Sequence, residues 1–162
     1  RPDNFCAVYL PEGEWIDFYT HKTYQGPANI ILRVPLEKIP LFIRAGSIIP
    51  MMKASSRIPE KLINPLILNL YPSKSSRNPY LDDQGSINFQ VEKKNYKIVL
   101  HLDGRRKRDF ILKFYHVLSY RDLLIEEQEK RVVAGSGDIL QKKRFLQVSL
   151  TRFENGKITI LL

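Results

Sequence analysis

The chain has 162 residues, of which 43% are hydrophobic and 27% are charged, and it contains a single cysteine. One cysteine cannot form an internal disulfide, and the sequence holds no Cys and His cluster with zinc-ligand spacing. The length is too short for a (β/α)8 barrel enzyme, which takes about 250 residues, and no apolar run approaches the ~20 residues of a transmembrane helix. Because the chain begins at Arg1 rather than Met, we expect a piece of a longer protein, and its localisation stays open.

The formal charge of +9 raises the question of a nucleic-acid partner. The basic residues form short groups at 93–94, 105–108 and 142–144, each next to an expected turn or strand end. A basic stripe interleaved with stacking aromatics would favour single-stranded nucleic acid, but the aromatics here fall within alternating apolar patterns. We therefore interpret the groups as solvated surface and expect no nucleic-acid partner, and a basic nucleic-acid-binding β-fold is the least favoured alternative.

Short apolar runs separated by Pro and Gly mark the first half of the chain. A run at 8–10 is expected to stop at Pro11-Glu12-Gly13, and a second run follows at 15–19. Further short strands are expected at 30–34 and 41–44. Strands of this length predict an antiparallel β-sandwich rather than a helical bundle. The stretch 52–65 has no period, and we read a linker there.

Strict alternation of apolar and polar residues marks the second half. Ile87, Phe89 and Val91 predict a half-buried strand over 86–92, and the same pattern runs over 96–102. Asp103-Gly104 then predicts a two-residue hairpin to a strand over 110–114.

A second hairpin is expected near the C-terminus. Asn155-Gly156 separates the apolar alternations at 146–150 and 158–162, and this dipeptide favours a two-residue turn. Residues 122–130 are compatible with a helix or with a strand. The whole pattern is that of an all-β chain.

No catalytic constellation stands out. Asp82-Asp83, followed by Gly85, is the acidic pair with a turn-like setting. Neighbouring strand residues point to opposite faces, so this pair cannot straddle a glycosidic bond. A turn in which the Asp side chains bond local N–H groups is favoured, and a calcium loop is a weaker alternative. The three histidines are scattered, and Cys6 is interpreted as an inert buried thiol.

Two strings resemble a known family. Residues 8–19 read VYLPEGEWIDFY and residues 39–51 read IPLFIRAGSIIPM. Together they resemble the segment that follows the catalytic barrel in family 31 glycoside hydrolases, the α-glucosidases and α-xylosidases. Leu70-Tyr71-Pro72 and then YLDDQGS at 80–86 resemble the start of that family's distal β-domain, with Gln84 as an insertion.

The resemblance implies a place in an architecture. It implies a proximal β-sandwich over residues 1–60, a linker at 61–65 and a distal β-sandwich over 66–162. The family's two catalytic aspartates belong to the barrel, whose motifs are missing here, so we expect no catalytic residue, no cofactor and no metal in this chain. The implied partner is the barrel in cis, which would bind the α-linked carbohydrate, and the chain alone is expected to be inactive.

Large side chains in the first string are the candidates for contact with the barrel. Trp15, Tyr19 and Phe42 are of the type enriched in interface cores. Arg44 could pin a neighbouring carboxylate or carbonyl, or could be an ordinary surface charge, and Gly46 is expected in a tight turn with positive φ.

A carbohydrate-binding module is the first functional alternative. Its candidates are tyrosines that could stack on sugar rings, namely Tyr24, Tyr80 and Tyr115.

Overall fold

The computed structural model describes residues 4–53, 56, 63–74, 76–82, 85–117, 119–128, 130–132, 139–142 and 144–162. Within these residues the chain forms strands and no helix, so the expected all-β, largely antiparallel class is confirmed. No described helix is long and apolar enough to span a membrane. The strands are β1 Phe5–Asp17, β2 Thr23–Arg33, β3 Phe42–Arg44, β4 Ile48–Met51, β5 Leu66–Leu70, β6 Ser76–Asp82, β7 Gly85–Lys94, β8 Lys97–Tyr115, β9 Asp122–Glu127, β10 Lys130–Val132, β11 Ile139–Gln141 and β12 Phe145–Leu161.

Two compact units divide the chain between Ala45 and Gly46. This division comes earlier than the linker expected at 61–65, part of which lies outside the described residues. The reason is strand pairing: β4 runs antiparallel to β5, with Ile48 opposite Leu70, and Ile48 joins the core of the second unit. The Pro- and Ser-containing composition of 52–65 predicted the linker there, whereas the hydrogen bonds between β4 and β5 place β4 in the second unit.

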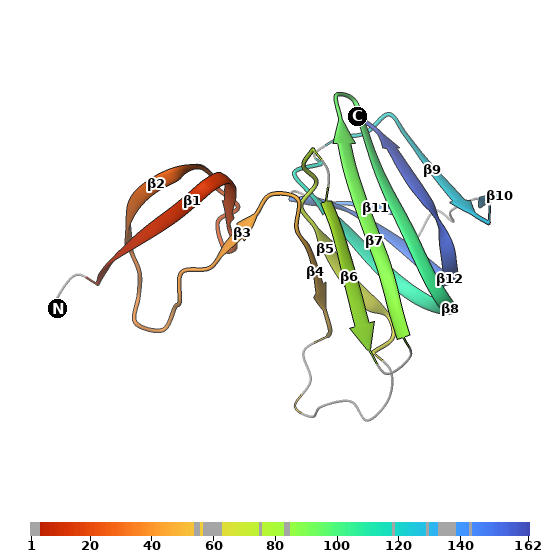
Figure 1. Ribbon diagram of the computed structural model, residues 1–162, viewed down its shortest axis with the longest axis horizontal. Coiled ribbons are helices and arrows are strands. Elements are labelled where there is room, and N and C mark those ends of the chain that lie inside the picture. The colour runs from red at the N-terminus through yellow and green to blue at the C-terminus, as the bar shows by residue number, and fades with distance from the viewer. Residues whose placement is uncertain are drawn as a thin grey trace. The chain divides into compact units, whose positions relative to one another are not determined.

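The first unit is a three-stranded antiparallel sheet in the order β2-β1-β3 (Figure 1). β1 does not stop at Pro11-Glu12-Gly13 as expected, but continues through a β-bulge between Leu10 and Gly13. A Cβ on the partner residue Gly26 would lie 1.9 Å from the Pro11 carbonyl oxygen, so only glycine lets the bulged strand approach this closely.

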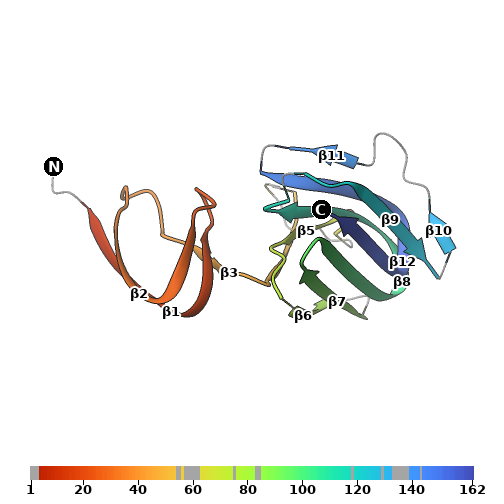
Figure 2. The same cartoon turned by 90° about the horizontal axis from the view of Figure 1, so that it is seen from above.

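Two long strands, β8 and β12, organise the second unit. They pair along almost their whole length, and each changes its other neighbour part-way. The first part of β8 pairs with β7, and its last part runs parallel to β5. In the same way, β12 pairs first with β11 and then with β9. The strands therefore bend from one layer of a sandwich into the other, as the curved β8 and β12 show in Figure 2.

Apolar side chains fill the space between these layers. Phe89 of β7 meets Phe110 of β8 edge to face with ring centroids 6.3 Å apart. The alternating residues of 86–92 point as expected, since Ile87, Phe89 and Val91 are buried. Residues 122–127, for which helix and strand were both compatible, form strand β9.

Neither expected hairpin forms. Asp103-Gly104 lies inside β8 and Asn155-Gly156 lies inside β12, where Asn155 is paired with Asp103. A type I′ turn needs positive φ at both central residues, and neither dipeptide provides it. The Asn155 side-chain oxygen instead accepts a hydrogen bond from the Gly104 N–H at 2.7 Å. The glycines serve the bend at which the two long strands change layers.

Candidate functional site

Three of the four candidate contact residues lie on one face of the small sheet. Register places Tyr24, Trp15 and Arg44 directly opposite one another across β2, β1 and β3. Phe42 is two residues before Arg44 and shares its face, and the Phe42 ring meets the Tyr24 ring edge to face with centroids 5.7 Å apart. The Trp15 indole N–H donates to the Pro11 carbonyl at 2.8 Å, which ties the indole to the bulge.

Arg44 extends across this row onto the bulge. A Cβ on Gly13, whose φ is +126°, would lie 3.5 Å from Nε and 3.7 Å from Nη2 of Arg44, so the guanidinium covers the glycine. Arg44 is exposed, and no carboxylate in the described part of the chain forms an ion pair with it. Its planar set of N–H donors is therefore open to an acceptor from outside the unit.

Tyr19 lies beyond the end of β1, at a cleft of about 310 Å³ that is also lined by Tyr24. The Lys38 Nζ is 5.6 Å from the centre of the Tyr19 ring, and the Lys22 Nζ is 5.1 Å from that of Tyr24. The Asp17 carboxylate accepts hydrogen bonds from the backbone N–H groups of Tyr19 and Thr20, at 2.9 and 2.7 Å. That carboxylate thus shapes the turn that carries Tyr19.

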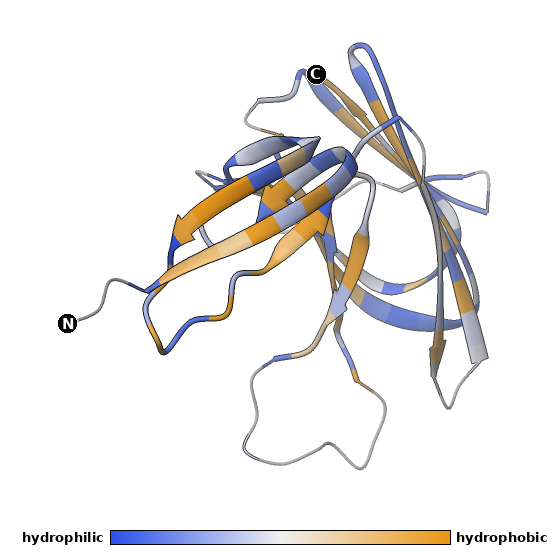
Figure 3. Cartoon of the chain, turned by 60° about the vertical axis from the view of Figure 1, so that its left-hand side comes forward, coloured by the Kyte–Doolittle hydropathy of each residue, from blue (hydrophilic) through white to orange (hydrophobic). Residues whose placement is uncertain are grey.

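The opposite face of the same sheet carries a surface that the sequence reasoning missed. Phe5 and Tyr9 of β1 and Ile31 of β2 share this face by register, and they are 62%, 62% and 74% exposed. Figure 3 shows the apolar bands along β1 and β2. We call these three residues the apolar triad. The sequence carries a signal for this surface, because Phe5 and Tyr9 fall on alternate positions of β1. Short strands were expected there, without an assignment of their residues to the two faces of a sheet.

The turn residues predicted in the second unit are placed as follows. Gly46 has φ 93° and lies in a turn, as expected, and its N–H donates to the Tyr71 carbonyl at 2.7 Å. Asp82 ends β6 and pairs with Gly85, whose φ is 112°. Asp83 lies outside the described residues. Among those that are described, no group of three or more His, Cys, Asp or Glu could hold a metal ion.

The tyrosines weighed as sugar platforms are all half-buried. Tyr80 packs against the core of the second unit. Tyr115 stacks on the buried Tyr71 with ring centroids 4.7 Å apart and planes 8° from parallel. Burial, reinforced by the neighbouring Tyr115, raises the pKa of the Tyr71 hydroxyl well above its ordinary value, and burial also raises the pKa of Tyr115. These rings serve packing within their own units.

A known family model matches the first unit. Residues 2–49 match the model of the glycosyl hydrolase family 31 C-terminal domain. Residues 2–49 are thus similar to the family 31 C-terminal domain. The match covers most of the first unit, including the three-stranded sheet, the bulge at Gly13 and Arg44, so the predicted resemblance is confirmed.

Relatives extend the likeness beyond that domain. The chain is 34% identical to an α-xylosidase of Saccharolobus solfataricus over 93 residues, which is 57% of this chain and 13% of the relative. It is 36% identical to a probable α/β-glucosidase of Aspergillus flavus over 108 residues, covering 60% of this chain and 12% of the relative. The chain thus spans about an eighth of the length of these curated relatives.

Both units have a counterpart in one solved structure. A family 31 dextranase of Flavobacterium johnsoniae, in complex with isomaltotriose, matches 98% of this chain and 24% of its own chain, with a TM-score of 0.82 and 25% identity. The family model ends at residue 49, just inside the second unit, and the rest of that unit shares its fold with the corresponding part of this dextranase.

Proposed function

We propose that these 162 residues are the non-catalytic C-terminal region of an α-glycosidase, and that the first unit packs against the catalytic barrel in cis. The barrel would bind and hydrolyse the α-linked carbohydrate, whereas this chain stabilises the barrel and helps to shape the substrate entrance. The observation that carries the proposal is the apolar triad on a sheet of the family 31 C-terminal domain.

Physical chemistry supports a docking role for the triad. Burying a large apolar side chain stabilises a protein by about 1.5–3 kcal/mol relative to leaving it exposed. Phe5, Tyr9 and Ile31 leave most of this stabilisation unused in the unit by itself. Apolar side chains gathered on one sheet face are typical of a surface that is covered by another domain.

The test uses the full-length glycosidase that contains this region. Ile31→Asp places a charge on the triad, and its matched control is Leu81→Asp, because Leu81 is 77% exposed on β6 of the second unit. We expect Ile31→Asp to lower the melting temperature of the full-length protein and to weaken hydrolysis of an aryl α-glucoside or α-xyloside through loss of folded enzyme. Leu81→Asp should change neither.

Two outcomes oppose the proposal. Equal melting of the Ile31→Asp and Leu81→Asp proteins would show that the triad stays in solvent. Full activity and unchanged melting after deletion of residues 1–162 would show that the region does not stabilise the barrel.

A further inference from the structure

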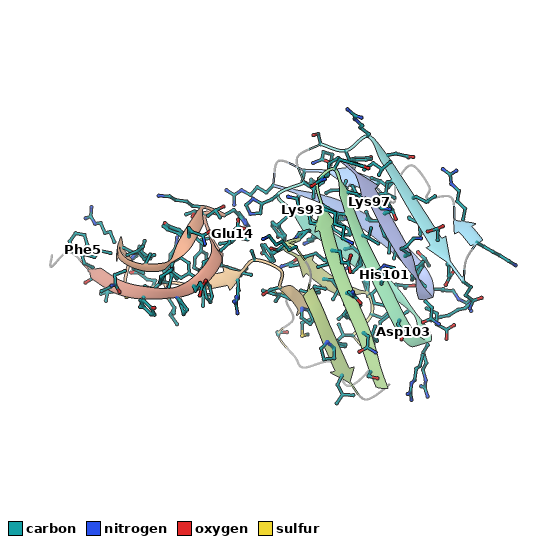
Figure 4. All side chains as sticks on the ribbon, turned by 45° about the horizontal axis from the view of Figure 1, so that its top comes forward. Phe5, Glu14, Lys93, Lys97, His101 and Asp103 are labelled. Carbon is teal, nitrogen blue, oxygen red and sulfur yellow. The ribbon has the colours of Figure 1, made fainter. Side chains whose placement is uncertain are left out.

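A groove lies on the outer face of the second unit, across β8, β12 and β9. Its volume is about 400 Å³, within the range of small-molecule sites. It is lined by His101 of β8, Glu126 of β9, Gln128 in the turn after β9, and Asn155, Gly156 and Lys157 of β12. His101 lies between Lys97 and Asp103 along β8 in Figure 4.

Strand register builds the groove. His101 is directly opposite Lys157, and Lys157 is directly opposite Glu126, so three polar side chains stand in one row across β8, β12 and β9. Gly156 lies between the outward-facing Asn155 and Lys157, and a Cβ there would meet the Glu126 carbonyl oxygen and the buried Phe153 ring. Gln128 adopts φ 48° and its N–H donates to the Asn155 carbonyl at 3.3 Å, which holds this turn at the edge of the row.

Both hydrogen-bond donors and hydrogen-bond acceptors remain available in the groove. The Asn155 oxygen is engaged by the Gly104 N–H, so its amide offers donors. Glu126 Oε2 is paired with the Lys157 Nζ, which leaves Oε1 as an acceptor. The Gln128 amide offers donors and an acceptor, and the His101 ring offers two nitrogen atoms for hydrogen bonding.

This mixture selects a class of ligand. An anion uses donors alone and would face the Glu126 carboxylate, while a cation uses acceptors alone and would face the Lys157 ammonium. A vicinal pair of hydroxyls donates and accepts at once and so matches the whole set. We propose that the groove binds a neutral saccharide. That the saccharide is an α-linked glucose oligomer rests on the function proposed above.

The test is a titration of the ¹⁵N-labelled 162-residue chain with maltotriose and, separately, isomaltotriose, followed by amide chemical shifts. We expect saturable shifts at His101, Gln128 and Gly156. His101→Ala and Gln128→Asn should each weaken binding by about tenfold, and asparagine is chosen because it tolerates positive φ. Lys97→Ala, on the same face of β8 but outside the groove, should bind as the unchanged chain does.

Each alternative outcome overturns the saccharide site. No saturable shift with either sugar, shifts confined to Tyr19 and Tyr24, or equal affinity for inorganic phosphate would do so. None of these results bears on the melting of the full-length Ile31→Asp protein, so the groove can fail while the docking role stands, and the reverse also holds.

Discussion

Arg44 is exposed with its guanidinium over Gly13, and no carboxylate in the described part of the chain pairs with it. We expect Arg44→Ala to lower the melting temperature of the full-length glycosidase by several degrees, since losing a hydrogen bond to a charged group costs about 1.5–3 kcal/mol. The rate of the glycosidase's chemical step should be unchanged by this substitution. In the 162-residue chain the same substitution should leave melting nearly unchanged, as for an exposed residue. Equal losses in both proteins would assign Arg44 to the stability of its own sheet.

Tyr71 gives a prediction about alkaline stability. Its pKa is raised in the folded chain by burial and by Tyr115, so above about pH 10 the unfolded chain releases a proton that the folded chain keeps. The free energy of unfolding should therefore be constant below pH 10 with respect to this group. Above pH 10 it should fall by about 1.4 kcal/mol per pH unit. Urea unfolding at a series of pH values measures the slope.

Because burial raises the pKa of Tyr115 as well, Tyr71→Phe should reduce the alkaline loss of stability without removing it, whereas Tyr96→Phe, at a 69% exposed side chain, should leave it in place. An unchanged slope in the Tyr71→Phe chain would assign the alkaline loss to other groups.

At the scale of elements, alternation in the sequence predicted the individual strands well because period two reports which residues face a core. Ile87, Phe89 and Val91 are buried as this pattern requires. Connectivity could not be predicted in the same way. Asp103-Gly104 and Asn155-Gly156 have the composition of hairpin turns, but composition does not tell a turn from a bend inside a strand. The decisive contact joins Gly104 to Asn155, 51 residues apart, and no local pattern reports it.

The bend predicts unequal costs for two glycine substitutions. A Cβ at Gly156 would meet the Glu126 carbonyl oxygen at 2.1 Å and the Phe153 ring at 2.4 Å, so β9 must move away from β12. We expect Gly156→Ala to destabilise the chain by about 1–3 kcal/mol, the cost of overpacking. At Gly104 the nearest atom is the Glu154 carbonyl oxygen at 3.1 Å, so Gly104→Ala should cost less. Equal urea midpoints for the two variants would contradict this account of the bend.

At the scale of the whole chain, charge and apolar burial divide unequally between the two units. Residues 46–162 contain 21 Lys and Arg against 12 Asp and Glu, while residues 1–45 contain five of each, so the formal charge of +9 lies on the second unit. In the described part of the first unit, the buried apolar residues are Leu10, Ile16 and Ile43, whereas the second unit has a continuous core. The sequence predicted two β-units, but their boundary depended on β4 pairing with β5.

This division predicts which part folds alone. Residues 46–162 bury a two-layer core, so we expect them to unfold cooperatively in urea without residues 1–45. Residues 1–45 bury little apolar surface, and a unit of this size needs a partner for stability. Produced alone, they should show poor amide dispersion, and in the 162-residue chain limited proteolysis should cut them before the second unit. A cooperative transition of isolated residues 1–45 would remove the need for a covering domain and would weaken the docking role of the apolar triad.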